Sequence, residues 1–355
     1  MPFVLTDSAA LRQAEFDTII DVRSPSEFAE DHVPGAVSMP VLSDAERAEV
    51  GTIYTQDSPF RARKIGAAMV ARNAARHIEE GLMDRDGGWR PLVYCWRGGQ
   101  RSGSFAAILG QIGWRVQTLE GGYRSWRRLV VGRLYDVDLK LRVVRLDGYT
   151  GTAKTALLAE IAALGGQVID LEGLARHRGS ILGDVDGEQP AQKGFETALV
   201  QALDAMDPAR PVLVEAESAR IGRLRIPPAL WVAMRGSPRI VVEAPVEARA
   251  RFLAGEYAGL AADAPALTAR LDGLRAIAGH ETVDGWLAML GEGRLEDLSE
   301  ALIRQHYDPA YGRLRRSDEG RVVARVELEA LDAGARAAAA RRIMEHLSGM
   351  ARNAA

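Results

Sequence analysis

The segment GYTGTAKT (residues 148–155) constrains the fold more than any other feature of this sequence. It follows an apolar run of strand length, LRVVRLDG (141–148), and precedes a helical stretch, TALLAEIAALGG (155–166). A strand, a glycine-rich turn and a helix direct backbone N–H groups and the positive end of the helix at one point, where they bind phosphate. Two more apolar runs, PVLVEAE (211–217) and RIVVEAP (239–245), are typical of strands in the same sheet. We therefore expect a parallel α/β sheet that carries a phosphate-binding loop.

This loop supplies the groups that a diphosphate needs. Its backbone N–H groups would cradle the anion, Lys154 would neutralise it, and Thr155 would hold Mg²⁺. The pattern normally has glycine before the lysine, whereas this chain has Ala153, whose Cβ narrows the loop. That departure counts against ordinary ATP turnover more than against phosphate binding, and it leaves open whether a nucleoside triphosphate also binds. The predicted diphosphate-binding residues are Gly148, Thr150, Gly151, Thr152, Ala153, Lys154 and Thr155.

Charged side chains follow the next two predicted strands. Glu215 and Glu217 close the first of them and are candidates to organise a metal ion or a water molecule, unless they only cap the strand. Arg249 follows the second strand on a helix, where P-loop kinases place phosphate-contacting arginines; a solvated helix face is the alternative. Beyond residue 246 the sequence is rich in alanine, leucine, arginine and glutamate, and we expect helices to the end.

Cys95 is the only cysteine of the chain, so an intrachain disulfide and a multi-thiolate zinc site are both excluded. The segment YCWRGGQRS places it after a buried strand and before a helix. Loop N–H groups, the positive end of the helix, and the charges of Arg97 and Arg101 would favour the reactive thiolate. Gly98 and Gly99 can adopt the positive φ angles of an anion-binding loop. We predict that Cys95, Arg97 and Arg101 are catalytic.

Four motifs in the first part of the chain are DVRSPSEF (21–28), HVPGAV (32–37), YCWRGGQRS (94–102) and LEGGYRSW (119–126). In this order they resemble the rhodanese family, which implies a chalcogen-carrying fold built around the cysteine. Five residues separate Cys95 from Arg101, one more than in the ordinary sulfur-transferring loop and as many as in the related dual-specificity phosphatases. The longer loop would enclose a larger group, such as a phosphoryl or selenium-bearing one. A phosphatase is disfavoured because Tyr94, in place of histidine, precedes the cysteine.

The length of 355 residues fits two domains. We place the boundary near residue 135, with a rhodanese-like domain at 1–135 and a P-loop domain with a helical C-terminal extension at 136–355. The first residues lack the basic-then-apolar pattern of a signal peptide, and no apolar run approaches the roughly 20 residues of a membrane helix. We therefore expect a cytoplasmic protein that makes no membrane contact.

Charge is distributed unevenly along the chain. The net charge of −3 does not mark a nucleic-acid-binding protein, but arginines cluster at 124–145, 220–225 and 313–316. Each cluster is either a solvated face or part of a surface that contacts phosphate groups.

The pairing of the two domains narrows the interpretation. A rhodanese domain fused to a P-loop domain is similar to the tRNA 2-selenouridine synthase family. Besides YCWRGGQRS, the strings that carry the likeness are PVLSDAERAEVGTIY, SPFRARKIGAAMVARN, LEGLARHRGS, QKGFE, EAESARIG and HYDPAYGR. The chain departs from the family at Ala153 and at Ala219, where a charged residue is more usual. The resemblance implies a transferase that geranylates the sulfur of wobble 2-thiouridine in tRNA and then replaces the S-geranyl group with selenium.

The same resemblance implies further ligands and residues. The co-substrates would be geranyl diphosphate and selenophosphate, with no tightly bound cofactor, and an enzyme that supplies selenophosphate would be a partner. His177, Arg178 and Ser180 would line the diphosphate or RNA side of the P-loop, unless the histidine is structural. Tyr307 and Tyr311 would stack on a base or close the site, although tyrosines at this spacing are equally typical of a core. The residues expected to contact tRNA are Arg124, Arg127, Arg128, Arg223, Tyr307 and Tyr311.

Other functions stay open on the sequence alone. They are a P-loop kinase or NTPase with a rhodanese sensor, a non-enzymatic tRNA-binding or sulfur-relay module, and a phosphatase. The sequence also leaves open whether Cys95 carries selenium covalently, the oligomeric state, the metal dependence, and which tRNAs are bound.

Overall fold

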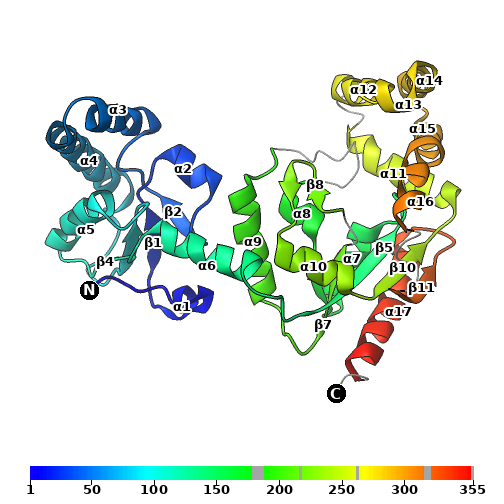
Figure 1. Ribbon diagram of the computed structural model, residues 1–355, viewed down its shortest axis with the longest axis horizontal. Helices are drawn as coiled ribbons and strands as arrows, with labels where there is room; N and C mark the ends of the chain where they lie inside the picture. The colour runs from blue at the N-terminus through cyan, green and yellow to red at the C-terminus, as the bar shows by residue number, and fades with distance from the viewer. Residues whose placement is uncertain (178–187, 216–217, 261–263, 316–320, 353–355) are drawn as a thin grey trace. The chain divides into compact units, whose positions relative to one another are not determined.

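The structure is a computed structural model, and it describes residues 1–177, 188–215, 218–260, 264–315 and 321–352 (Figure 1). The chain divides into two compact units, Met1–Val137 with Pro190–Asp204, and Asp138–Gln189 with Ala205–Ala355. Each unit is built on a parallel sheet of its own. Within the described part of the chain, no helix combines the length and the apolar character needed to span a membrane.

The first unit contains a four-stranded parallel sheet in the order β2-β1-β3-β4. Its strands are β1 (Thr18–Asp21), β2 (Ala36–Ser38), β3 (Pro91–Tyr94) and β4 (Gln117–Thr118). β3 is buried along its whole length, which explains its continuous apolar sequence. Because the strands are parallel and Asp21 pairs with Tyr94, the loops that follow β1 and β3 lie at the same edge of the sheet.

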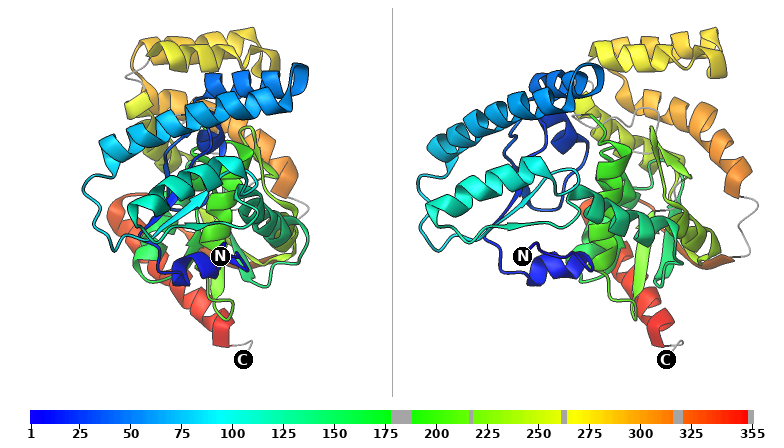
Figure 2. Two further views of the ribbon diagram at one scale, coloured as in Figure 1. Left: turned by 90° about the vertical axis from the view of Figure 1, so that its left-hand side faces the viewer. Right: turned by 60° about the vertical axis from the view of Figure 1, so that its left-hand side comes forward.

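Helices surround this sheet. They are α1 (Ser8–Gln13), α2 (Pro25–Glu30), α3 (Asp44–Gln56), α4 (Pro59–Gly81), α5 (Gln100–Ile112), α6 (Tyr123–Tyr135) and α9 (Gln192–Asp204). Between β2 and β3, α3 and α4 run side by side (Figure 2). A serine caps the start of each: Ser43 forms a capping box with Glu46, and Ser58 precedes a proline at the first helical position. These caps fix where the two helices begin.

Helix α9 comes from the second half of the sequence, yet it belongs to the first unit and packs on α6. Glu196, only 1% exposed, accepts a hydrogen bond from the Tyr135 hydroxyl (2.6 Å) and pairs with Arg127. Trp126 Nε1 donates to Thr197 Oγ1 (3.2 Å). The buried Glu196 carboxylate requires Tyr135 and Arg127 as partners because an uncompensated buried charge is strongly unfavourable.

The second unit contains a five-stranded sheet in the order β11-β10-β5-β7-β6, and every pairing in it is parallel. Its strands are β5 (Arg142–Gly148), β6 (Gln167–Ile169), β7 (Pro211–Glu215), β10 (Arg239–Glu243) and β11 (Val322–Glu327), beside a separate hairpin of β8 (Arg220–Ile221) and β9 (Leu224–Arg225). The expected parallel α/β sheet is confirmed. The expectation of helices alone beyond residue 246 is wrong at β11, where Val322, Ala324 and Val326 alternate with more exposed residues and add an edge strand.

Ten helices and one π-helical turn of the described residues complete this unit. They are α7 (Lys154–Ala163), α8 (Leu171–Ala175), α10 (Pro228–Gly236), α11 (Val246–Leu260), α12 (Ala264–Asp272), α13 (Arg275–Ala278), α14 (His280–Gly291), α15 (Leu295–Leu302), a π-helical turn (Ile303–Tyr307), α16 (Asp308–Arg315) and α17 (Ala333–Arg352). α7 and α17 pack against the sheet through Leu157, Ile161 and Ile343. The helices from α11 to the π-helical turn form a core of their own around Trp286.

Candidate active site

The Cys95 thiol lies at the end of β3, in the loop that leads into α5. Its Sγ accepts hydrogen bonds from the backbone N–H of Gly99 (3.3 Å) and from the hydroxyl of Ser102 (3.2 Å). The residue is 4% exposed, and this burial by itself raises the pKa of Cys95. Hydrogen bonds from Ser102 and from the N–H of Arg97, together with the charge of Arg101, outweigh burial and hold the pKa of Cys95 below its ordinary value. The loop therefore stabilises the nucleophilic thiolate.

The two arginines of this loop differ in position. The Arg101 guanidinium donates to Glu27 (2.9 Å), a residue of the DVRSPSEF motif. Burial raises the pKa of Glu27, but the hydrogen bond and the charge of Arg101 have the larger combined effect with the other partners of the carboxyl. The pKa of Glu27 therefore lies below its ordinary value. Arg97 is exposed, and it is the backbone N–H of this residue that acts on the sulfur. The predicted electrostatic role thus belongs to Arg101, whereas the Arg97 side chain lies at the surface.

The segment LEGGYRSW holds the Cys95 loop in place through backbone hydrogen bonds. At the start of α6, the N–H of Tyr123 donates to the Cys95 carbonyl (2.8 Å) and that of Arg124 donates to the Trp96 carbonyl (3.2 Å). Gly122 has a φ of +61°, and a Cβ on it would lie 2.2 Å from the Cys95 carbonyl oxygen. No residue with a side chain fits there unless the loop moves, which explains the glycine in this motif.

Only one of the two glycines in the Cys95 loop has the predicted conformation. Gly98 has a φ of +68°, and a Cβ on it would lie 2.8 Å from the Leu119 carbonyl oxygen. Gly99 has a φ of −97° and is the residue that precedes α5, so the prediction of a positive φ is wrong for this position. Its contribution is the N–H that it donates to the Cys95 sulfur.

The loop of residues 148–155 connects β5 to α7, as the sequence predicts. α7 begins at Lys154, whose Nζ donates to the Gly148 carbonyl (3.0 Å). Gly151 has a φ of +85°, and Ala153 has φ 58° and ψ 32°, a left-handed conformation. This conformation strains a residue with a Cβ by about 1–2 kcal/mol. The loop therefore keeps the backbone shape that glycine would give it, despite the methyl group of Ala153.

Arg249 braces the phosphate-binding loop from α11. Its Nε donates to the Thr150 carbonyl (2.9 Å), and its two terminal nitrogens donate to Asp308 (3.0 and 2.6 Å). Within the loop, the Thr152 hydroxyl donates to the Tyr149 carbonyl (2.8 Å). Because the guanidinium is buried and engaged in this way, Arg249 positions the loop, and the predicted direct phosphate contact does not fit this geometry.

Two carboxylates and one hydroxyl meet at the base of the phosphate-binding loop. Thr155 Oγ1 lies 3.1 Å from Glu215 Oε1 and 3.2 Å from Glu172 Oε2. The N–H of Glu172 donates to Glu215 Oε2 (3.2 Å) and fixes the buried Glu215 carboxylate. These are oxygen donors of the kind that Mg²⁺ prefers, so the residues fit a magnesium ion beside a diphosphate. Thr155 and Glu215 were predicted from the sequence, but Glu172 was missed; its only signal is an acidic residue in the first turn of α8, shortly after β6.

The residues predicted to contact tRNA fall into two groups. Arg124 and Arg128 are exposed on α6, and Arg223 is exposed between β8 and β9, so these three can reach a ligand. Arg127 is neutralised by Glu196 instead. Tyr307 is 5% exposed and packs in the core around Trp286, so its ring offers no face to a base. The burial of Tyr307 does not fit the predicted contact with a base, whereas the contact of Arg127 with tRNA stays a prediction.

Some predicted positions lie outside the described residues. They are Arg178, Ser180 and Glu217, together with the side chain of Tyr311.

Comparison with known proteins places both units in one family. Residues 6–129 match the rhodanese-like domain, and residues 141–280 match the AAA domain of tRNA 2-selenouridine synthase. The tRNA 2-selenouridine synthase of Cupriavidus necator is 34% identical over 91% of this chain and 95% of its own length. That of Verminephrobacter eiseniae is 32% identical over 93% and 98%, and that of Hahella chejuensis is 33% identical over 82% and 84%. The chain therefore belongs to the tRNA 2-selenouridine synthase family of enzymes.

Proposed function

We propose that this enzyme converts wobble 2-thiouridine of tRNA into 2-selenouridine through an S-geranyl intermediate, with geranyl diphosphate and selenophosphate as co-substrates. The observation that carries the proposal is the presence of two different anion-binding loops in one chain. One contains Lys154 beside the Glu172 and Glu215 carboxylates, and the other surrounds the Cys95 thiolate. The first suits the departure of a diphosphate, and the second suits chemistry with an anionic selenium donor.

In the first step, the sulfur of 2-thiouridine attacks C1 of geranyl diphosphate. The C1–S bond forms, the C1–O bond breaks with its electron pair leaving on the diphosphate, and the base loses its N3 proton. Lys154, the loop N–H groups and the positive end of α7 stabilise the charge on the leaving diphosphate. Thr155, Glu172 and Glu215 would hold Mg²⁺, which neutralises part of the same charge.

The second step must conserve electrons. Selenophosphate carries selenium at the oxidation level of selenide, so a perselenide on Cys95 would require an oxidant. A route without one begins when the Cys95 thiolate attacks the phosphorus of monoprotonated selenophosphate: the S–P bond forms, the Se–P bond breaks, and selenium leaves as HSe⁻ with the proton of the selenophosphate. The loop N–H groups and the spacing of five residues before Arg101 suit a transferred phosphoryl group.

Selenium then enters the base. HSe⁻ attacks C2 of the geranylated nucleoside, the C2–Se bond forms, the C2–S bond breaks, and geranylthiolate leaves. The selenium proton moves to N3, and water hydrolyses the S-phosphocysteine to phosphate and free thiol. We further place the reaction in the cytoplasm, with an enzyme that makes selenophosphate as the supplier.

Two single variants of the full chain test this division of labour. On 2-thiouridine tRNA with both co-substrates, Cys95→Ala should accumulate S-geranyl-2-thiouridine, and Lys154→Ala should form neither product. On tRNA that is geranylated beforehand, Lys154→Ala should form 2-selenouridine. Nucleoside mass spectrometry distinguishes the products. The proposal is overturned if both variants convert 2-thiouridine to 2-selenouridine at the wild-type rate.

A separate measurement tests the phosphorus attack. Wild-type protein mixed with selenophosphate alone should gain one phosphoryl group on the peptide that contains Cys95. A selenium adduct on that peptide would exclude this route and leave the rest of the proposal intact.

A further inference from the structure

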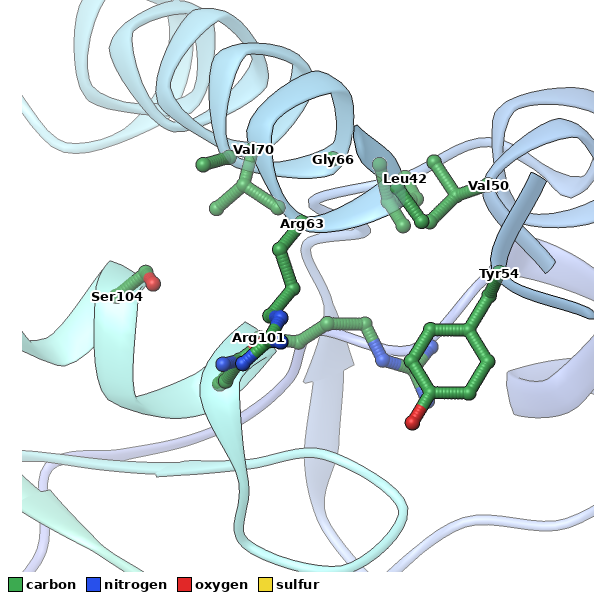
Figure 3. Close-up of a pocket in the computed structure, with 11 residues that line it drawn as sticks. Leu42, Val50, Tyr54, Arg63, Gly66, Val70, Arg101 and Ser104 are labelled. Carbon is green, nitrogen blue, oxygen red and sulfur yellow. The ribbon is translucent and has the colours of Figure 1, made fainter. Parts of the chain in front are cut away.

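A pocket of about 590 Å³ opens in the first unit beside the Cys95 loop. Helices α3 and α4 form most of its wall, and Leu42 and the first turns of α5 form the rest (Figure 3). Leu42, Val50 and Val70 give much of its wall an apolar lining, and Arg63, Gln100 and Arg101 add polar groups. Its volume falls within the range of about 300–1,000 Å³ that is typical of small-molecule sites.

The pocket exists because α4 has small residues on the side that faces it, and the side chains of α3 do not fill the volume left there. Gly66 and Ala67 lie on the side of α4 that lines the pocket. α3 has an apolar stripe of Val50, Ile53 and Tyr54, yet none of its residues is fully buried, and Tyr54 is 55% exposed. An apolar stripe that the fold leaves partly uncovered, next to a pocket whose wall is largely apolar, suits a ligand with an apolar chain.

The start of α5 links this pocket to the thiol. Arg101 lines the pocket, and its charge also acts on the Cys95 thiolate. Ser102, the next residue, donates to the Cys95 sulfur at 3.2 Å, and Ser104 lines the pocket again. A nucleoside held for reaction at the thiol loop therefore has this pocket beside it, because the first turns of α5 contribute to both.

We propose that this pocket binds the geranyl chain of the S-geranylated wobble nucleoside during selenation. The pocket thereby makes the prenyl group a recognition element, and it admits the alkylated base in preference to a base with a small S-substituent. This inference rests on the function proposed above and adds the site at which the intermediate is recognised. The chain remains in the pocket while the C2–S bond breaks, and it leaves with the sulfur.

Two synthetic anticodon stem-loop RNAs test the inference with the full-length wild-type protein. One carries S-geranyl-2-thiouridine at the wobble position and the other carries S-methyl-2-thiouridine, and selenophosphate is the common co-substrate. Both thiolates leave from the same C2 atom, so a difference in rate at subsaturating RNA reports recognition of the chain. Because burial of each additional apolar carbon strengthens binding severalfold, the wild type should prefer the geranyl RNA by at least about a hundredfold.

One pair of variants locates this preference. Ala67 and Ala68 are both exposed on α4, but only Ala67 lines the pocket. Ala67→Phe should obstruct the pocket and lower the rate on the geranyl RNA at least tenfold without changing the rate on the methyl RNA. Ala68→Phe adds the same side chain outside the pocket and should keep the wild-type preference.

The outcomes separate the two levels of the proposal. Equal wild-type rates on the two RNAs, or an equal loss on both RNAs in Ala67→Phe, would overturn the inference about the pocket and leave the proposed function standing. The second of these results would indicate that the pocket holds RNA. If the wild type makes no 2-selenouridine from either RNA, the proposed function is wrong and the inference falls with it.

Discussion

The Ser102 hydroxyl contributes more than any other group to lowering the pKa of Cys95, and Ser102→Ala should therefore make the thiolate harder to form. The hydroxyl lies 3.2 Å from Sγ on a fully buried side chain, so bulk water does not replace it. A hydrogen bond to a charged group contributes about 1.5–3 kcal/mol. Since about 1.4 kcal/mol changes a proton equilibrium tenfold, the variant should contain about ten- to a hundredfold less thiolate at a fixed pH below the midpoint.

Alkylation with iodoacetamide measures this effect directly, because Cys95 is the only cysteine and only its thiolate reacts. The thiolate exists above the pKa, so the lowered pKa of Cys95 should give the wild type fast alkylation at a pH where an ordinary thiol is still protonated. Ser102→Ala should shift the profile to higher pH. Ser104→Ala, an exposed serine on the same helix, is the control and should leave it unchanged. Identical profiles for the wild type and Ser102→Ala would refute the reasoning.

Three further changes test other parts of the molecule. Glu215→Gln removes a charge beside Thr155 and should raise the Mg²⁺ concentration needed for geranylation by about ten- to a hundredfold. Selenation of geranylated tRNA should not depend on this change. If both reactions need more Mg²⁺, the magnesium assignment is contradicted. Arg127→Met leaves the buried Glu196 without its cation and should lower the free energy of unfolding of the first unit by about 3–5 kcal/mol, measured in urea. Arg124→Met, at an exposed position of the same helix, is the control and should change it little. Equal effects of the two variants would show that the ion pair is unimportant. Ala153→Gly relieves about 1–2 kcal/mol of backbone strain, because residue 153 has a left-handed conformation. The glycine also makes the unfolded chain more flexible, which costs about 0.4–1 kcal/mol of stability. The free energy of unfolding should therefore stay the same or rise by up to about 1.5 kcal/mol, and a clear decrease would argue against the left-handed conformation.

The fold class could be predicted because its signals are local. Both functional loops are short segments in which a strand, a turn and a helix follow one another within about 20 residues, and each such segment forms the expected unit. Composition averaged over a long stretch fails to detect a short strand within it. The alternating valines of β11 stand in an alanine- and arginine-rich region, and they were therefore predicted as helix together with their neighbours.

Contacts between distant segments could not be read in this way. Glu172 reaches Thr155 only because β6 and β5 flank β7 in a parallel sheet, an order that no local pattern gives. Arginine and tyrosine are ambiguous for a different reason, since both combine an apolar body with a polar end. Tyr307 is buried in the helical core around Trp286, and Arg127 is half-buried where it pairs with Glu196 of α9, a helix distant in sequence. These contacts decide how far each side chain is exposed, and no local pattern gives them.

Helix α9 also sets an order of events while the protein is being made. When Val137 has left the ribosome, Trp126, Arg127 and Tyr135 are present, but Thr197 and Glu196, the residues that bind them, have not been synthesised. The nascent chain must therefore pass through β5 and α7 before the first unit receives its last helix. Folding of the first unit cannot finish when its N-terminal stretch has emerged, because it must wait for a stretch of the second unit to be made before α9 follows. A fragment cut after Val137 would expose the groups that α9 covers.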